Sequence, residues 1–583
     1  MVITIARCTI RDNAGYVGTG ICFDSCSCTL EDCTIINNAC SRDLNGRSWG
    51  GGIYCYDSSA TIRGCTISRN AAYMGAGIYA YESSGSIEGC DITGNLGIPD
   101  SQGFSWGGGI SCYESSPEIS ICAVSDNFAW RGGGISCYGS SPSIGACSLV
   151  ENTANQGGGI YLQGDPSAVV FDCYLEGNVA TPDSDGYSDG GGIACLEGSP
   201  TVRDCTFVRN SAVSGGGLDF EESSPVITNC LILDNAGIPN KMGRSWAGGL
   251  SSYRSSSRID GCTISGNSAW MGAGLVLGDL PTGITDSEVT NCIITGNVAA
   301  PSPEGDCRGG GISCYSRFSL IRDCSICDNT ASIGGALYCF LGGASAISDC
   351  IIWGNADKMI YLRDEAVVAI VHTCIEGGYE GEGNIQADPL FVTGPFGDYY
   401  LSCQGAGQRE NSPCVDAGSD SAENLRLGQL TTRTDSEADA GVVDMGYHYP
   451  IYLGEATIEC SLNASRFRPG DYLVGSLKVA NDGPDIEVDV YVAFVLPDGA
   501  IFCITPHGGL IGEILPWIRY MPLPENYSFG PAPMFQTTVP DGLPFGDYLF
   551  AAALSSPERF EVIGDIALFP FTLRAETIST VYE

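Results

Sequence analysis

Residues 50–70 read GGGIYCYDSSATIRGCTISRN, and this stretch carries two marks that recur until about residue 355. The first is a glycine box, Gly-Gly-Gly-Ile, and the second is a Cys-x-Ile-x-x-Asn box. One glycine box follows the next after 25 residues, or after 32 to 37 where a loop is inserted. The Asn of the second box falls at positions 13, 38, 70, 95, 127, 152, 178, 210, 235, 267, 297, 329 and 355. Such a fixed period predicts a fold in which one structural unit is copied many times.

Within a unit the apolar residues alternate with other residues, as in β-strands. Ile53 and Cys55 form one short run, and Ile62, Cys65 and Ile67 form the next. Ser-Ser-Pro, Gly-Gly and Asn interrupt the runs, and these are turn formers. A unit of two or three short strands is typical of one coil of a parallel β-helix, in which identical side chains stack about 4.8 Å apart. We therefore predict an all-β rod of about 13 coils of about 25 residues each.

Each repeated position has a structural role in this rod. The Ile and Cys columns point inward, and the glycine box permits positive φ where the chain turns. An Asn side chain can donate to one neighbour and accept from another, so the Asn column is expected to form a ladder between coils. We expect this ladder to include Asn70, Asn95, Asn127, Asn152, Asn178 and Asn210.

The paired boxes resemble the repeats of bacterial polymorphic outer-membrane proteins. More broadly, the array is similar to the right-handed parallel β-helices of the pectate-lyase-like superfamily, and the likeness covers about two thirds of the chain. The resemblance implies a secreted or cell-surface bacterial protein. It does not single out an activity, because the superfamily contains polysaccharide lyases, hydrolases, epimerases, adhesins and passenger domains.

Three regions are expected along the chain. Residues 1–375 form the β-helix, residues 376–454 form its end cap or linker, and residues 455–583 form an immunoglobulin- or fibronectin-like β-sandwich. The segments 387–391, 397–401, 412–418 and 444–447 resemble the closing segment of secreted bacterial β-helix proteins, which would cover the exposed strand edges. The Pro- and aromatic-rich segment 516–544 is predicted to be a long loop.

The chain of 583 residues has a net charge of −41. Such a surface repels nucleic acid and anionic lipid, so neither is an expected partner. No apolar run is long enough to span a bilayer. Because the sequence opens in the second half of a repeat, we expect an N-terminally incomplete chain whose missing signal does not argue against an extracellular or cell-surface location. No cofactor or dedicated metal site is predicted, although weak Ca²⁺ binding is open, with Asp388, Asp416 and Asp444 as the candidate ligands in the cap.

Most of the 30 cysteines follow the coil period and are expected to be buried thiols. Cys403 and Cys414 lie outside the array and are the better candidates for a disulfide. Cys324 and Cys327 form a lone CxxC whose alternation points the two thiols to opposite faces, which argues against zinc.

Five longer connections enter at the same point of the repeat and should project from one side of the rod. Three of them end in Trp, and two further Trp fall in what is expected to be the equivalent place of other coils. Aromatic faces with neighbouring charged groups could line a sugar-binding groove, although each Trp could instead pack on the glycine-rich backbone. The candidate ligand-binding residues are Trp49, Trp106, Trp130, Trp246, Trp270, Arg47, Arg131, Arg244, Arg308, Asp100, Asp183, Asp185 and Asp189.

No catalytic residues are predicted. The Gly-His-Gly and Arg-Ile-Lys segments of pectinase-type hydrolases do not occur, and the chain has only three His. We therefore expect a binding or adhesion module, with a polysaccharide or cell-surface glycan as its partner. Two alternatives stay open: a polysaccharide lyase or glycoside hydrolase, and a purely structural surface rod.

Overall fold

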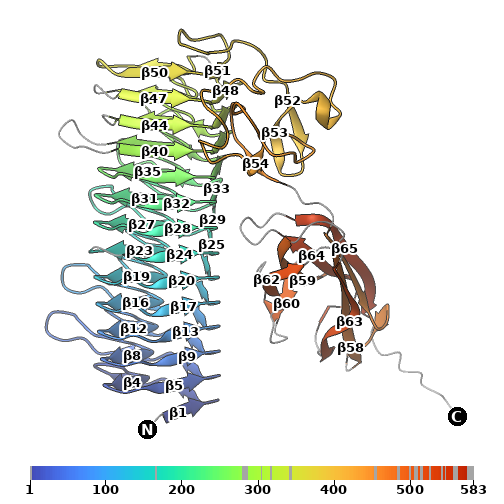
Figure 1. Ribbon diagram of the computed structural model, residues 1–583. Coiled ribbons are helices and arrows are strands. Elements are labelled where there is room, and N and C mark those ends of the chain that lie inside the picture. Colours follow the sequence, from blue (N-terminus) through green and yellow to red (C-terminus); the bar gives the residue numbers. More distant parts are fainter. Residues whose placement is uncertain are drawn as a thin grey trace, which may run out of the picture. The chain divides into compact units, whose positions relative to one another are not determined.

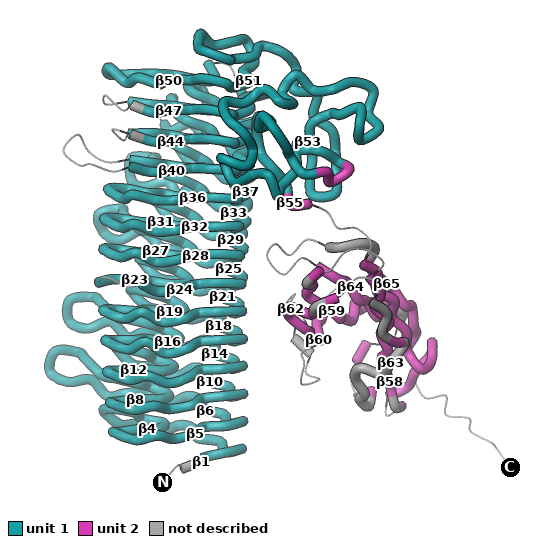
Figure 2. The backbone as a smooth tube through the Cα atoms, in the orientation of Figure 1, with its two compact units in different colours: residues 1–434, 438–449 teal, residues 435–437, 450–583 magenta. Residues whose placement is uncertain are grey.

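A computed structural model (Figure 1) shows how the repeats are arranged. Two compact units divide the chain, one comprising residues 1–434 and 438–449 and the other residues 435–437 and 450–583 (Figure 2). The structure describes residues 3–164, 167–278, 286–303, 305–315, 318–340, 344–356, 358–451, 456–469, 471–481, 486–497, 501–504, 510–511, 517–523, 527–539, 543–544, 546–555 and 562–573.

The first unit contains a parallel β-helix with three long sheets, here named sheets I, II and III. Successive coils pair in register, so that Ile53, Ile78 and Ile110 are direct neighbours in sheet I. The 13 strands of sheet I are β4 (Ile21–Asp24), β8 (Ile53–Tyr56), β12 (Ile78–Tyr81), β16 (Ile110–Tyr113), β19 (Ile135–Tyr138), β23 (Ile160–Gln163), β27 (Ile193–Leu196), β31 (Leu218–Glu221), β35 (Leu250–Tyr253), β39 (Leu275–Gly278), β43 (Ile312–Cys314), β46 (Leu337–Cys339) and β49 (Ile360–Leu362).

Sheets II and III have 14 strands each and complete the wall of the rod. Sheet II contains β1 (Ile3–Ala6), β5 (Cys28–Glu31), β9 (Thr61–Arg63), β13 (Ser86–Glu88), β17 (Glu118–Ser120), β20 (Ser143–Gly145), β24 (Val169–Phe171), β28 (Thr201–Arg203), β32 (Val226–Thr228), β36 (Arg258–Asp260), β40 (Asp286–Thr290), β44 (Phe318–Arg322), β47 (Ala344–Ser348) and β50 (Val367–Val371). Sheet III contains β2 (Thr9–Arg11), β6 (Thr34–Ile36), β10 (Thr66–Ser68), β14 (Asp91–Thr93), β18 (Ala123–Ser125), β21 (Ser148–Val150), β25 (Tyr174–Glu176), β29 (Thr206–Val208), β33 (Leu231–Leu233), β37 (Thr263–Ser265), β41 (Ile293–Thr295), β45 (Ser325–Cys327), β48 (Ile351–Trp353) and β51 (Cys374–Ile375).

Two-residue strands follow sheet III and form two further small parallel sheets. They are β3 (Ala14–Gly15), β7 (Ala39–Cys40), β11 (Ala71–Ala72) and β15 (Leu96–Gly97) in one, and β22 (Thr153–Ala154), β26 (Val179–Ala180), β30 (Ser211–Ala212), β34 (Ala236–Gly237), β38 (Ser268–Ala269) and β42 (Val298–Ala299) in the other.

The inward columns of all three sheets form one continuous core. Ile53, Ile62 and Ile67 are at most 2% exposed, and their counterparts on the other coils join the same cluster. This burial is what the period-2 pattern of the repeat predicts. Because each strand is short, the stability of a coil depends on its neighbours, as in other solenoids.

Between two coils, the asparagine ladder satisfies the buried turn after sheet III. Asn152 Nδ2 donates to Asn178 Oδ1 at 3.0 Å and to the carbonyl oxygen of Val124 at 2.8 Å. Its own Oδ1 accepts from the backbone N–H and from Nδ2 of Asn127. The side chain therefore uses both its donors and its acceptor inside the rod, where an unpaired group would be costly.

All 30 cysteines are free thiols in the structure, and only Cys8, Cys22, Cys26 and Cys460 are not buried. The prediction of a disulfide between Cys403 and Cys414 is wrong. Cys414 lies instead in a hydrophobic cluster with Cys374 of β51, and a hydrogen bond with Cys414 lowers the pKa of the Cys374 thiol. The error arose because the spacing along the chain does not show which coil the cap segment meets.

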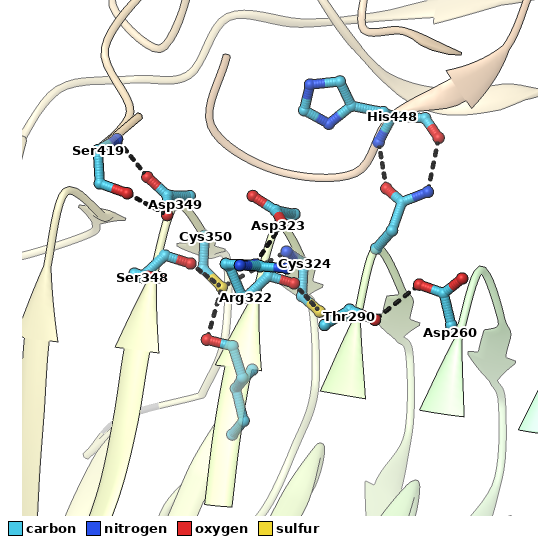
Figure 3. A network of polar contacts seen from close by, with 12 residues as sticks. Asp260, Thr290, Arg322, Asp323, Cys324, Ser348, Asp349, Cys350, Ser419 and His448 are labelled. Atoms are coloured by element: carbon cyan, nitrogen blue, oxygen red, sulfur yellow. Dashed lines mark hydrogen bonds and ion pairs between the residues drawn. The ribbon is translucent and has the colours of Figure 1, made fainter. Parts of the chain in front are cut away.

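The cap contains β52 (Phe391–Gly394), β53 (Gly397–Leu401), the 3₁₀-helix η1 (Gln404–Ala406), β54 (Leu430–Thr431) and β55 (Tyr449–Pro450). Polar contacts join it to the turns that follow sheet II (Figure 3). Asn291 Nδ2 donates to the carbonyl oxygen of His448 at 3.0 Å, and the His448 backbone N–H donates to Asn291 Oδ1 at 2.7 Å. Asp349, at the same turn position on a later coil, accepts hydrogen bonds from the backbone N–H and the hydroxyl of Ser419. The cap is thus part of the same compact unit as the rod.

The second unit contains two sheets that enclose one hydrophobic core, to which Val490, Leu477 and Phe550 contribute. Segment 516–544, predicted to be a loop, instead contributes β62 (Ile518–Leu523) and β63 (Tyr527–Thr538), which pair with long neighbouring strands. The likeness to an immunoglobulin or fibronectin domain stays a prediction. The strands are β56 (Ala456–Leu462), β57 (Arg466–Phe467), β58 (Tyr472–Asn481), β59 (Ile486–Val495), β60 (Ile501–Ile504), β61 (Leu510–Ile511), β62 (Ile518–Leu523), β63 (Tyr527–Thr538), β64 (Gly546–Ser555) and β65 (Val562–Leu573).

Candidate functional site

One residue per coil, immediately before the glycine box, stacks on its counterparts through parallel bridges. We name this stack the corner column. Its members are Val17, Trp49, Met74, Trp106, Arg131, Gln156, Asp189, Ser214, Trp246, Met271, Arg308 and Ile333.

A residue with positive φ follows each of these residues and turns the chain into sheet I; it is glycine on every coil except after Trp246, where it is Ala247. Gly50 has a φ of +60°, and a Cβ there would lie 2.6 Å from the Cβ of Tyr54. Glycine adopts this φ at the lowest cost, although Ala247, which follows Trp246, holds the same position with a φ of +47°. The turn brings the corner column beside the outward side chains of sheet I, and these two sets together are here named the corner face.

At the N-terminal end of the corner face, aromatic rings line a pocket of about 460 Å³. The rings of Tyr54 and Tyr79 stack with centroids 5.6 Å apart, and Tyr81 meets Tyr113 edge-on at 5.5 Å. Burial raises the pKa of Tyr54 to about 12, so its hydroxyl stays neutral and can donate. The lining residues are Val17, Trp49, Tyr54, Met74, Tyr79, Tyr81 and Tyr113.

The aromatic run continues beyond the pocket toward the middle of the rod. Tyr113 stacks on Tyr138 at 5.1 Å, and Tyr138 meets the ring of Trp106 at 6.2 Å. Trp106 in turn contacts Tyr161, again at 6.2 Å. Aromatic rings therefore follow five successive strands of sheet I, from β8 to β23.

A polar chain of side chains adjoins this run. Arg131 Nε donates to Gln156 Oε1 at 2.8 Å, and Gln156 Nε2 donates to Asp189 Oδ2 at 2.8 Å. Arg131 also donates to Gln163 Oε1, which accepts a second hydrogen bond from the Tyr161 hydroxyl. Each side chain is thus held in place by its neighbours on the next coil.

Carboxyl groups gather where the polar chain ends. Asp219, buried on the outward side of β31, accepts a 2.6 Å hydrogen bond from the Ser214 hydroxyl. Burial, with the nearby charge of Asp189, raises the pKa of Asp219 to about 8. Burial also raises the pKa of Asp189 and of Glu221, and the charge of Asp189 adds to the second shift. Groups in such surroundings can hold or release a proton near neutral pH.

Several residues predicted for the site have a structural role instead. Asp183 Oδ1 accepts hydrogen bonds from three backbone N–H groups of its own loop, one of them that of Asp185. Asp185 itself is an exposed residue. Asp100 closes its loop in the same way through the N–H groups of residues 102 and 104. Arg47, which is exposed, lies 3.9 Å from Asp100 Oδ2 across two stacked loops. Among the predicted acids, Asp189 is the one that lies in the corner column.

The five tryptophans do not form one row. Trp49, Trp106 and Trp246 belong to the corner column, whereas Trp130 and Trp270 lie one position earlier in their coils. Their assignment to an equivalent place is therefore wrong, because Arg131 and Met271, the residues that follow them, are the ones that bridge to Trp106 and Trp246. The backbone N–H groups of Trp130 and Trp270 donate to Ser105 and Ser245, the residues before Trp106 and Trp246.

Packing separates these tryptophans further. Trp270 is only 6% exposed, and the guanidinium groups of Arg244 and Arg308 both lie over its ring, at 5.0 and 5.3 Å from the centroid. Trp246 meets Trp270 edge-on at 6.3 Å, and Trp130 meets Phe104 edge-on at 5.5 Å. Around Trp270 the aromatic and Arg side chains therefore cover each other.

The sequence reasoning missed the outward residues of sheet I. They follow the Ile or Leu of the glycine box by one or three positions, so the repeat itself marks them. Their role becomes visible only when the neighbouring coils are stacked, because it depends on which outward side chains meet. The missed residues of the corner face are Tyr54, Tyr79, Tyr81, Tyr113, Tyr138, Tyr161, Asp219 and Glu221.

Within the described residues, no group of three or more His, Cys, Asp or Glu is arranged to hold a metal ion. Asp388 accepts the N–H of Leu390 within a turn of the cap, and Asp444 accepts the N–H of Asp416 and so joins two segments of the cap. The described residues also contain no helix that is long and apolar enough to cross a membrane.

Comparisons with known proteins bear on the fold. No curated protein sequence matches this chain. Among solved structures, the pectate lyase Pel9A matches 76% of this chain and 88% of its own at 11% identity and a TM-score of 0.23. A family 123 glycoside hydrolase from Clostridium perfringens, described for glycolipid glycan hydrolysis, matches 21% of this chain at 11% identity and a TM-score of 0.15. The sporulation control protein Spo0M from Bacillus subtilis matches 21% at 14% identity and a TM-score of 0.14. This chain spans 28% and 50% of the lengths of the last two.

The family comparison is the informative one. A model described as the right handed beta helix region matches residues 1–180, 133–309 and 249–383, which together make up well over half of the chain. The matched residues are those that form sheets I, II and III. The predicted right-handed parallel β-helix is therefore confirmed, and the chain belongs to the right-handed β-helix family.

Proposed function

We propose that this protein is a carbohydrate-binding module whose ligand lies along the corner face. The observation that carries the proposal is the aromatic pocket, in which five of the seven lining residues are Trp or Tyr. Sugar rings present apolar C–H faces that pack on aromatic faces, and their hydroxyls need hydrogen-bond partners at the side. Tyr hydroxyls and the amides of Gln156 and Gln163 supply such partners.

A role outside the cell or at its surface, in binding or adhesion, fits this proposal. The rod presents the same corner position on every coil, and a long polymer can contact many coils at once. The acidic surface disfavours nucleic acid as the ligand, because it would repel the phosphate backbone.

The test is retention of the full-length protein on a panel of immobilised or gel-entrapped polysaccharides, compared with two variants. Trp106→Ala removes a ring of the corner face, and we expect retention to fall at least tenfold. Phe128→Ala removes a ring that is 44% exposed on another column, and we expect it to bind like the unchanged protein. Equal retention of the two variants would contradict the proposed site.

A second candidate function, a polysaccharide lyase or glycoside hydrolase, is favoured by the carboxyl cluster. A protonated acid beside an ionised carboxylate is the pair that glycosidic cleavage uses, and Asp219 with Asp189 or Glu221 could provide it. The assay is the appearance of reducing ends or unsaturated uronates over hours of incubation. If such products form and Asp219→Asn abolishes them while binding is retained, the enzyme is the better description. If no polysaccharide is bound or cleaved, the protein is better described as a purely structural rod.

A further inference from the structure

From the distribution of charge along the corner face, we infer that the ligand is an uncharged, linear polysaccharide lying parallel to the rod axis. The inference rests on the proposed function and names the class of ligand. It follows from the direction of the aromatic run, the absence of charge in the pocket lining, and the sign of the charge beyond it.

The direction comes from the strand order. The ring contacts lead from Tyr54 to Tyr79, from Tyr81 to Tyr113, and from Tyr113 to Tyr138, and each step crosses to the next coil. Three such steps separate β8 from β19, which makes the accessible aromatic run about 14 Å long at the usual spacing of about 4.8 Å between strands, since Tyr161 on β23 is only 1% exposed. A sugar unit of an extended chain advances by a similar length, so successive sugars can meet successive coils.

The pocket itself has no charged lining residue among the seven described. An acidic sugar placed there would lose water around its carboxylate and gain no cation in return. Burying an unpaired charge costs far more than burying a hydroxyl that finds a partner. The pocket therefore favours sugars whose polar groups are hydroxyls.

Beyond the aromatic run the corner face carries acidic groups, of which Asp219 keeps its proton up to a pH of about 8. Asp189, Asp219 and Glu221 lie close enough for the charge of Asp189 to raise the pKa of the other two. Arg131 already bonds Gln156 and Gln163, and its guanidinium lies over the rings of Trp106 and Tyr161. Farther along, Arg254 pairs with Glu222 at 3.0 Å. A uronate polymer would thus meet acidic side chains whose neighbouring cations are already engaged, and the repulsion grows as pH rises and these acids ionise.

The test uses two pairs of polymers that differ in charge on one backbone. The first pair is hydroxyethyl cellulose and carboxymethyl cellulose, and the second is fully methyl-esterified and de-esterified polygalacturonate. Affinity electrophoresis of the full-length protein is run at 20 and 300 mM salt. We expect the neutral member of at least one pair to bind at least tenfold more tightly at 20 mM salt, with a smaller difference at 300 mM because salt screens the repulsion.

A variant locates the binding. Tyr54→Ala should weaken binding of the neutral polymer at least tenfold, and Phe128→Ala should leave it unchanged. Tighter binding of the anionic member in both pairs would overturn the inference and leave the proposed function standing. Neutral binding that Tyr54→Ala does not weaken would also overturn it. Failure of all four polymers to bind would count against the proposed function itself and this inference with it.

Discussion

The guanidinium of Arg131 lies 4.6 Å from the ring centroid of Trp106, its neighbour in the corner column. The same group lies 5.1 Å from the ring of Tyr161 on sheet I. One cation therefore joins the corner column to the sheet beside it, at the place where the aromatic run meets the polar chain.

Replacement of the Arg131 side chain should lower the stability of the fold. We expect Arg131→Ala to lower the free energy of unfolding by about 1–3 kcal/mol, because cation–π contacts and charge-assisted hydrogen bonds are lost together. Arg131→Lys should recover little, since an ammonium cannot reproduce the planar fork that meets Gln156 and Gln163. Urea unfolding followed by circular dichroism measures the change. The control is Arg47→Ala, whose side chain is 51% exposed, with an expected effect below about 1 kcal/mol.

The asparagine ladder gives a larger expected effect. Asn152→Ala removes four hydrogen bonds and leaves the buried amide of Asn127 and the carbonyl of Val124 without their partner. Each unsatisfied buried group costs about 1–3 kcal/mol, so the loss of stability should be about 3 kcal/mol or more. Asn45→Ala, in an exposed loop, is the matched control. A loss below about 1 kcal/mol for Asn152→Ala in urea unfolding would show that the ladder contributes little.

The glycine box can be tested by two substitutions of one kind. A Cβ at Gly52 would lie 2.6 Å from the carbonyl oxygen of Gly77, whereas at Gly89 it would meet nothing within 4 Å. Gly89 has a φ of +56°, so alanine there carries only the left-handed penalty of about 1–2 kcal/mol. We expect Gly52→Ala to lower the thermal midpoint clearly more than Gly89→Ala. The reverse order in calorimetry would contradict close approach of the coils at this corner.

The raised pKa of Asp219 has a defined sign in a pH titration of stability. The group holds a proton up to pH of about 8 when folded but releases it near its ordinary value of 3.8 when unfolded. The folded state therefore binds more protons across this window, and stability falls as pH rises from about 4 to 8. Asp219→Asn should raise the unfolding midpoint at pH 8 and change it little at pH 4. Asp185→Asn, at an exposed loop residue, should shift neither midpoint.

The contact between Asn291 and His448 predicts a change confined to the cap. Asn291→Gly introduces a residue that also tolerates the φ of +45° at this position. It removes both hydrogen bonds to the His448 backbone. We expect faster hydrogen exchange at the amides of residues 444–449, measured by mass spectrometry. Asn229→Gly changes the same turn position on a coil where the side chain bonds Asp204, and should leave the cap amides unaffected.

The sequence predicted the rod because its structure repeats what the sequence repeats. Ile53 and Cys55 alternate in the chain and both point into the core. The corner face was harder to predict, since it depends on which residues of different coils become neighbours. Asp189 and Asp219 are 30 residues apart, and a one-residue difference in alignment separates Trp130 from the corner column. Loops of unequal length hide such alignments until the bridges between coils are seen.

For the same reason, the sequence did not show that the Cys414 thiol packs beside Cys374 instead of bonding to Cys403. Spacing shows that two cysteines are near in the chain, but the cap reaches back over the last coils before it ends. Strands β62 and β63 show a different limit of prediction from sequence. Their Pro and aromatic residues suggest a loop, but pairing with long neighbouring strands makes these segments extended.

The cap contacts define where the cap docks on the rod, and they do not depend on how long the rod is. Asn291, Ser325 and Asp349 stand on three successive coils, and each bonds a particular group of the cap. The cap thus recognises its place by side chains and not by how many coils come before. Whole coils between residues 100 and 250 could therefore be gained or lost by in-frame duplication or deletion without moving the docking point. A lineage could in this way lengthen or shorten the ligand track while the closure of the rod stays under separate selection.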